Sequence, residues 1–457
     1  MKNVVIILIF ASVALWAQTN PLNITTAQVV KDMGLGINLG NTFESNGDWI
    51  DKNVNAYETA WGSPTITEAI IDGYANAGFK TVRIPVAWTN LMTDSGRGGS
   101  YTISTALLDR VEQVVDWVLN KNMYAIINIH HQGWIKEKFP TDSAECMNRY
   151  KKMWNQISNK FKNKSGYLIF ESLNEEGVWT DVWTDMYSNG TTGKARAFGL
   201  LNAINQEFTT LVRSSGGNNA NRHLLIAGYD TNIDRTSDPA FKMPTDSKNR
   251  CAVSVHYYDP FGFTHLEKDE SWEQKRLTWG TDADYNELKN SMNKMKTNFV
   301  DKDIPVIVGE YGMATQGRAQ SEIRKYTLAV AEAIYSRNMC PVLWDIQLNP
   351  DKGESIFYYN RKSNPPAFTD QQLVTGFKNL TGISSSSSSS LAVSSSSSLQ
   401  SSSSNNSTPI TNYSPLATPN SPTYYSLKGE PLGSTKPQKA GVYIVKQGSS
   451  VRKIAVR

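Results

Sequence analysis

The stretch Tyr167-Leu168-Ile169-Phe170-Glu171-Ser172-Leu173-Asn174-Glu175 joins a short apolar run to a polar end. Such a run is typical of a strand that is buried on both faces of a parallel sheet. We therefore predict a buried strand at Tyr167–Glu171. Seven similar runs occur elsewhere in the chain, at Gly34–Leu39, Thr81–Pro85, Tyr124–His130, Leu224–Ala227, Ala252–His256, Val306–Glu310 and Val342–Trp344.

Amphipathic segments lie between these runs and predict helices, for example over Ile66–Ala77, Leu107–Asn120 and Glu322–Ser336. Eight strands that alternate with helices between residues 20 and 382 predict an α/β fold, a (β/α)8 TIM barrel. A doubly wound open sheet is the alternative. No Gly-rich phosphate loop follows the first strand, which disfavours that alternative.

The beginning of the chain predicts export. Lys2 is followed by the apolar run Val4–Val13, which is too short to span a bilayer, so residues 1–17 are predicted to be a signal peptide. We therefore expect a secreted protein, extracellular or at the cell surface, without a membrane anchor.

The end of the chain has a different composition. Residues 383–422 are dominated by Ser and predict a disordered linker. Residues 423–457 predict a short β-rich tail with strands at Gly441–Val445 and Val451–Val456. This tail resembles the C-terminal sorting domains of type IX secretion systems, which implies contact with secretion machinery. A degenerate binding module is the alternative.

Charge and cysteine content exclude some classes of protein. The net charge of +4 comes from scattered Lys and Arg, which argues against a nucleic-acid partner. Cys146, Cys251 and Cys340 are far apart and lack the spacing of metal ligands, so buried free thiols are expected.

Polar residues cluster at the predicted carboxyl ends of the strands, where a barrel of this kind builds its active site. They are Arg83, His130, His131, Asn174, Glu175, His256, Tyr258, Glu310 and Trp344. Glu175 follows the fourth strand and Glu310 ends the seventh, so the barrel brings them to one mouth. Two facing carboxyl groups suit acid/base and nucleophilic work on one bond.

Seven motifs in this region closely resemble those of glycoside hydrolase family 5. They are Gly36–Thr42, Val82–Pro85, Asn128–His131, Phe170–Glu175, His256–Tyr258, Val308–Gly312 and Leu343-Trp344. The segment Glu58–Pro64 is similar to subfamily 4, which holds endoglucanases, lichenases, xyloglucanases and some xylanases. Gln132 and Glu176 depart from the family pattern beside the site, which bears on substrate preference.

The resemblance implies a role for each matching residue. Glu175 corresponds to the acid/base and Glu310 to the nucleophile, while Arg83 and Tyr258 match residues that hold the nucleophile. The other substrate-binding residues are expected to be His130, His131, Asn174, His256 and Trp344, with Trp344 as the platform under the sugar at the cleavage site. The implied activity is that of a monomeric, retaining endo-β-1,4-glucanase without a cofactor or metal, acting on cellulose or mixed-linkage β-glucan.

Neighbouring charges are expected to give the two carboxyl groups different protonation states. The negative charge of Glu310 is expected to keep Glu175 protonated, whereas Arg83 is expected to keep Glu310 ionised. The chain also has many Trp residues, whose rings suit stacking on sugar faces. Candidate platforms are Trp49, Trp61, Trp134, Trp179, Trp183, Trp272 and Trp279, and we favour Trp134 and Trp179 because they follow the third and fourth strands.

Several alternatives remain. A xyloglucanase, xylanase or mannanase could use the same fold, and an inactive barrel could bind polysaccharide through its aromatic residues. A metallohydrolase using His130, His131, His256 and Glu310 is disfavoured, because adjacent residues of a strand point to opposite faces.

Overall fold

The computed structural model describes residues 20–130, 133–179, 182–183, 190–347 and 355–382, and four strands between residues 423 and 456. The predicted signal peptide and linker, His131 and Gln132 lie outside these residues. The chain divides into two compact units, Met1–Ser386 and Ser387–Arg457. Among the described helices, none is both long and apolar enough to cross a membrane.

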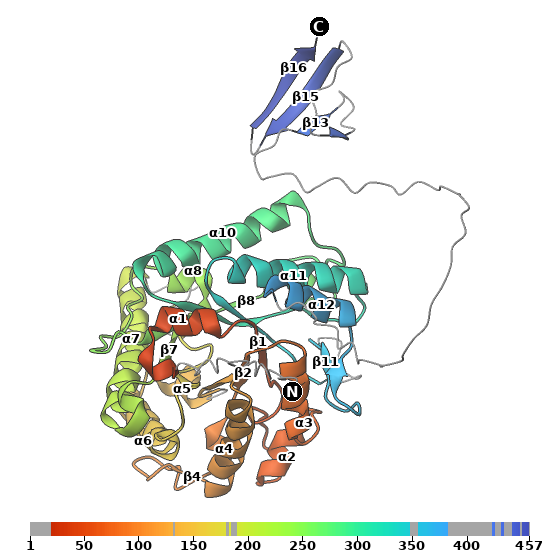
Figure 1. The fold of residues 1–457 in the computed structure, drawn as a ribbon. Helices are drawn as coiled ribbons and strands as arrows, with labels where there is room; N and C mark the ends of the chain where they lie inside the picture. Colours follow the sequence, from red (N-terminus) through yellow and green to blue (C-terminus); the bar gives the residue numbers. More distant parts are fainter. Residues whose placement is uncertain are drawn as a thin grey trace, which may run out of the picture. The chain divides into compact units, whose positions relative to one another are not determined.

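Eight parallel strands of the first unit form a closed barrel, and helices surround it (Figure 1). The strand order is β1-β10-β9-β8-β7-β6-β5-β2, and β1 also pairs with β2 to close the ring. The bounds are β1 Gly36–Asn38, β2 Thr81–Ile84, β5 Tyr124–Ile127, β6 Leu168–Glu171, β7 Leu224–Asn232, β8 Cys251–Tyr257, β9 Val306–Tyr311 and β10 Cys340–Leu343. The eight predicted strands are all present, which confirms the (β/α)8 barrel.

The helices of this unit have an apolar face on the barrel, as Ile70, Ile71 and Tyr74 of α3 illustrate. Their bounds are α1 Thr26–Asp32, α2 Val54–Thr59, α3 Glu68–Asn76, α4 Thr105–Asn120, α5 Gly133–Lys138, α6 Ser143–Phe161, α7 Gly190–Ser214, α8 Ile233–Thr236, α9 Phe261–Thr264, α10 Asp282–Asn298, α11 Gln320–Tyr335 and α12 Gln371–Leu380. The three helices predicted from periodicity correspond to α3, α4 and α11.

Helix α1 closes the amino end of the barrel. A capping box between Thr25 and Gln28 starts this helix. Val29 and Val30 of this helix, and Met33 just after it, pack against side chains from inside the barrel, namely Tyr124, Ile126, Ile169, Leu225, Ala252, Ile307, Cys340 and Val342. The half of the barrel interior next to the amino ends of the strands is therefore a packed apolar core.

A polar layer lies above this core, because residues two apart in a strand share a face. In β6, Ile169 belongs to the interior core and Leu168 and Phe170 pack toward the helices, so Glu171 points inward. The same alternation in β2 directs Val82 and Ile84 outward and Arg83 inward. The interior thus becomes polar as the strands approach their carboxyl ends.

Strand β9 breaks the alternation by one residue. Val308 pairs with Val255 of β8, whereas Glu310 pairs with His256, so Gly309 has no paired partner in β8. Such a bulge reverses the direction of the side chains that follow it. Glu310 consequently faces the same interior as His256.

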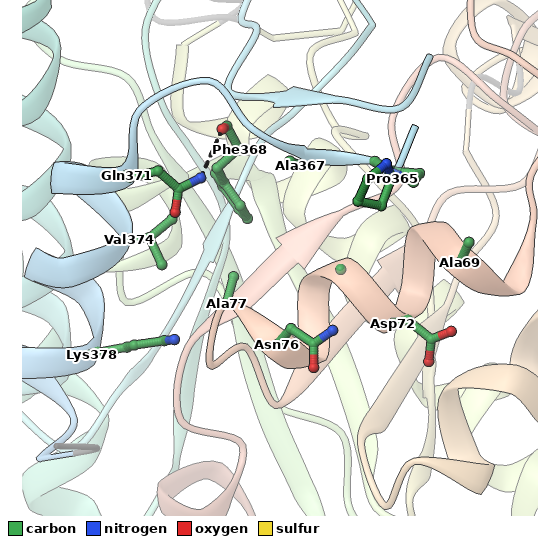
Figure 2. A pocket seen from close by; sticks show the side chains of 12 residues that line it. Ala69, Asp72, Asn76, Ala77, Pro365, Ala367, Phe368, Gln371, Val374 and Lys378 are labelled. Atoms are coloured by element: carbon green, nitrogen blue, oxygen red, sulfur yellow. Dashed lines mark hydrogen bonds between the residues drawn. The ribbon is translucent and has the colours of Figure 1, made fainter. Parts of the chain in front are cut away.

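A short hairpin and α12 complete the first unit. Strands β11 (Tyr359–Asn360) and β12 (Ala367–Phe368) pair antiparallel, and their segment lies against α3 (Figure 2). A cavity of about 370 Å³ separates α3 from Pro365, Phe368 and Lys378 of this segment.

One smaller pairing and the second unit account for the remaining strands. Strands β3 (Met92–Thr93) and β4 (Thr102–Ile103) form a two-stranded antiparallel sheet. The second unit has an antiparallel sheet in the order β14-β13-β15-β16. Its strands are β13 Thr423–Tyr425, β14 Pro431–Gly433, β15 Gly441–Gln447 and β16 Ser450–Val456.

The three cysteines are free thiols, as predicted. Cys146 and Cys340 are buried, while Cys251 is partly exposed, contrary to the expectation that all three are buried.

Candidate active site

Arg83 lies at the centre of the polar layer and its side chain is fully buried. Its Nε donates to Glu171 Oε2 at 2.7 Å, and its Nη1 donates to Glu310 Oε1 at 2.8 Å and to Asn38 Oδ1 at 3.0 Å. Its Nη2 donates to Asn174 Oδ1 at 2.8 Å. Burial alone would lower the pKa of Arg83, but the charges of Glu171 and Glu310 outweigh it and raise that pKa. One permanent positive charge is thus shared by two carboxylates.

Glu310 has a second donor on its other oxygen. The hydroxyl of Tyr258 donates to Glu310 Oε2 at 2.9 Å. Burial, and then the charge of Glu310, raise the pKa of Tyr258 well above its usual range, so the phenol keeps its proton. The side chain of Glu310 is only 7% exposed. Arg83 and Tyr258 therefore fix both oxygens of this carboxylate in one orientation.

Glu175 reaches the same place from the loop after β6. Its Oε1 lies 2.7 Å from Nδ1 of His256, and that nitrogen is 3.5 Å from Oε2 of Glu310. A ring nitrogen of His256 and one carboxyl oxygen each of Glu175 and Glu310 all lie within 4.8 Å of one another. The side chain of Glu175 is 46% exposed, in contrast to the buried Glu310. One carboxyl group is thus open to solvent and the other is enclosed.

His256 lies within reach of both carboxylates. Burial lowers its pKa, but the charge of Glu310 and the hydrogen bond with Glu175 outweigh it, and the pKa is raised. Glu175, His256 and Glu310 have the donor types of a metal site, and in this structure His256 Nδ1 lies 2.7 Å from Glu175 Oε1 and 3.5 Å from Glu310 Oε2.

His130 and Trp344 form a wall beside these groups. Their rings are parallel within 8°, with centroids 6.0 Å apart. Asn128 Nδ2 lies 3.1 Å from Nδ1 of His130, and Asn174 Nδ2 lies 3.3 Å from its Nε2. Asn174 also accepts from Arg83, which in turn donates to Glu171 and Glu310. The Asn174 amide and Arg83 thus connect His130 to these two carboxylates.

The structure corrects the choice of aromatic platforms. Trp179 is 2% exposed and stacks on Phe139, and Trp134 is 9% exposed with the guanidinium of Arg149 4.6 Å from its ring centre. The prediction that Trp134 and Trp179 are platforms is wrong, because sugar stacking needs an exposed ring face. Among the described tryptophans, Trp49 and Trp272 are exposed at 70% and 63%.

Sequence reasoning assigned no role to several members of the network. Glu171 is fully buried, and its Oε1 accepts from Ser254 Oγ at 2.7 Å while Oε2 accepts from Arg83. Asn38 accepts from Arg83 and donates to the Gly309 carbonyl at 2.8 Å, which ties the network to the bulge in β9. A polar residue inside an otherwise apolar buried strand was the available signal for Glu171, Ser254 and Asn38.

Glu44, in the loop after β1, is a fully buried carboxyl group near the mouth of the barrel. It accepts from the backbone N–H of Asn41 and, at 2.9 Å, from that of Thr42. Burial raises the pKa of Glu44 to about 7, against the opposing effect of these hydrogen bonds and of Arg361. In the unfolded chain the same group has a pKa near 4.5.

Replacing Glu44 with Gln should change how stability depends on pH. Between pH values of about 4.5 and 7 folded Glu44 holds a proton that the unfolded chain releases, so the contribution of Glu44 to stability falls as the pH rises. From pH 5 to pH 8, Glu44→Gln should gain on the order of 2 kcal/mol of unfolding free energy relative to wild type. Urea unfolding at several pH values measures this difference. A difference that stays constant over the range would contradict it.

Comparison with known proteins agrees with this geometry. A family model described as Cellulase (glycosyl hydrolase family 5) matches residues 43–350. Endoglucanase A of Paenibacillus barcinonensis is 34% identical over 381 residues, which cover 77% of this chain and 89% of that protein.

Solved structures give the same result. A GH5-4 broad-specificity endoglucanase from an uncultured bovine rumen ciliate is 34% identical with a TM-score of 0.70, covering 79% of this chain and 99% of that one. A mutant lichenase from a Caldicellulosiruptor species, solved with cellotetraose, is 32% identical with a TM-score of 0.70, covering 80% of this chain and 97% of that one. The chain therefore belongs to the cellulase family, glycosyl hydrolase family 5, and is a glycoside hydrolase.

Proposed function

We propose that this protein is a retaining endo-β-1,4-glucanase that hydrolyses cellulose or mixed-linkage β-glucan, with Glu310 as the nucleophile and Glu175 as the acid/base. The observation that carries the proposal is the proximity of the two carboxylates, whose oxygens lie within 4.8 Å of each other. Retaining glycosidases have carboxyl groups about 5–5.5 Å apart, whereas inverting enzymes leave about 6.5–9.5 Å for a water molecule.

In the first step, a Glu310 oxygen forms a bond to the anomeric carbon while the bond from that carbon to the leaving oxygen breaks. Glu175 gives its proton to the leaving oxygen. Arg83 and Tyr258, which contact both oxygens of Glu310, hold the attacking group in line and keep it from rotating. The exposure of Glu175 suits a group that must reach an oxygen of the bound chain.

In the second step, Glu175 accepts a proton from water, and the water oxygen bonds to the anomeric carbon. The bond from that carbon to Glu310 breaks and restores the carboxylate. His256, within reach of both carboxylates, stabilises negative charge on whichever of them carries it. Two inversions give net retention.

The relatives support β-1,4-glucan as the substrate. Endoglucanases and a lichenase solved with cellotetraose match this chain over about four fifths of its length. The exposed rings of Trp49 and Trp272 would offer stacking faces for further sugars of a long chain, which suits cleavage within the chain.

The test is hydrolysis by the purified protein. On barley β-glucan and carboxymethylcellulose we expect new reducing ends and an early fall in viscosity, unchanged by a chelator. Proton NMR of cello-oligosaccharide hydrolysis should show the β-anomer first. Glucomannan, xyloglucan and xylan in parallel reveal another preferred backbone. The α-anomer as first product would contradict the assigned roles, and binding without cleavage would indicate an inactive barrel.

We also propose that the enzyme acts as a secreted monomer. Residues 1–17 support export, and the resemblance of residues 423–457 to sorting domains supports passage to the surface or medium. An enzyme for insoluble or long-chain glucan must meet its substrate outside the cell, which agrees with this proposal.

A further inference from the structure

The segment that follows β10 is fixed to the outside of the barrel at Tyr359. The ring of Tyr359 lies 4.6 Å from that of Tyr74, and its hydroxyl donates to the Ile70 carbonyl at 3.3 Å. Gly73 of α3 has no room for a side chain, because a Cβ there would lie 1.7 Å from the Tyr359 oxygen. In Figure 2 this part of α3 faces the chain around Pro365 and Phe368. The backbone of the hairpin is therefore firmly placed.

Arg361 extends from this hairpin into the upper edge of the barrel. Its side chain is fully buried, and Nη1 donates to the Gly40 carbonyl at 2.6 Å and to Ser63 Oγ at 3.0 Å. Nη2 donates to the Asp345 carbonyl at 2.7 Å and to Asp345 Oδ2 at 2.9 Å. One guanidinium thus joins the loop after β1, the segment before α3 and the loop after β10.

Two of these contacts adjoin Trp344. Asp345 is its neighbour in the chain, and Asp345 Oδ1 accepts from the backbone N–H groups of Tyr358 and Tyr359 at 2.8 and 2.9 Å. Gly40 lies against the indole ring, since a Cβ on Gly40 would be 3.0 Å from Trp344 Cζ2. Gly40 N–H also donates to the Asp345 carbonyl at 3.1 Å. Arg361 therefore binds both Gly40, which lies against the Trp344 ring, and Asp345, which follows Trp344 in the chain.

We propose that Arg361 is a positioning residue for Trp344, setting the depth and tilt of the indole ring beneath the sugar at the cleavage site. The inference rests on the proposed function, in which Trp344 is that platform. Without the guanidinium, the Gly40 carbonyl loses its donor, the Asp345 carbonyl keeps only the Gly40 N–H, and the Asp345 carboxylate is left buried without its counter-ion. The two loops are then joined there by the Gly40–Asp345 backbone hydrogen bond without the guanidinium, and the indole ring beside them is held less firmly in place.

The test compares Arg361→Met with Arg222→Met. Arg222 is a matched control, because it is also fully buried and donates to the Phe161, Lys164, Ser165 and Leu168 carbonyls, but at the amino end of the barrel. Both substitutions should lower the Tm. Only Arg361→Met should lower kcat/KM on cellotetraose, by roughly tenfold to a hundredfold, as expected when a group at the site is displaced by about 1 Å. Equal losses of kcat/KM in the two variants would overturn the proposal.

A double-mutant cycle separates positioning from a merely structural role. In a Trp344→Ala background there is no ring to position, so Arg361→Met should cause little further loss of kcat/KM. The same fold loss in both backgrounds would overturn the proposal. If Arg361→Met does not fold, Arg361→Lys and Ser63→Ala, which remove fewer contacts, enter the same cycle with the same criteria. A wild-type enzyme that cleaves no glucan would instead refute the proposed function.

Discussion

Replacing Glu310 with Gln should lower kcat for β-glucan hydrolysis by at least about 10⁴-fold, because the neutral amide cannot form the glycosyl-enzyme bond. The substitution keeps the size of the side chain and an oxygen that can accept from Arg83, so the fold should be maintained. The loss should appear in kcat rather than in substrate binding, since the remaining contacts to the sugar are unchanged. Initial rates on barley β-glucan, with Tm as a check on folding, measure the effect.

Glu310→Ala gives a sharper version of this experiment. Sodium azide can enter the space left by the carboxylate and attack an activated aryl cellobioside from the same face. A single displacement inverts the anomeric carbon, so the product should be the α-glycosyl azide. Glu207→Gln, at a surface carboxylate paired with Lys151, is the control and should retain wild-type rates. Near-normal turnover by Glu310→Gln, or a β-azide from Glu310→Ala, would refute Glu310 as the nucleophile.

Glu175→Ala should produce a loss that depends on the leaving group. Hydrolysis of β-glucan should fall by about 10²–10⁴-fold, because the departing sugar oxygen must be protonated. A dinitrophenyl cellobioside needs no proton to leave, so formation of the glycosyl-enzyme on Glu310 should remain fast. That intermediate should then accumulate, because no base activates the water that releases it.

The measurement is a pre-steady-state burst of dinitrophenol from Glu175→Ala, followed by slow turnover. Added azide should accelerate the slow phase and give the β-glycosyl azide, the opposite stereochemistry to that from Glu310→Ala. An equal loss on both substrates, with no burst, would show that Glu175 is not the acid/base. The two alanine variants thus assign the two faces of the sugar independently.

The sequence was sufficient to predict the barrel and the elements that meet at its mouth. Buried parallel strands are short apolar runs, and these are readable without a structure. Because a closed parallel barrel gathers the carboxyl ends of all its strands, Glu175 and Glu310 could be placed together although 135 positions separate them (310 − 175).

Side-chain direction near irregular backbone could not be predicted. A strict alternation along β9 would send Glu310 outward with Val306 and Val308, and only the bulge at Gly309 turns it inward. The burial of Trp179 could not be predicted either. An indole in a loop can pack on the core or face solvent, and tertiary packing decides which of the two it does. The sharing of Arg83 between Glu171 and Glu310 also depends on three strands at once.

Helix α1 has a practical consequence for handling the enzyme. Its residues close the barrel at the end opposite to the catalytic groups, and His223 secures the chain there through Thr26 and the Pro21 carbonyl, each at 2.9 Å. A tag, immobilisation linker or fused module attached ahead of Asn20 would project from the closed end of the barrel. Glucan could then still approach the open end. Truncation into α1 would instead expose the apolar residues inside the barrel to solvent.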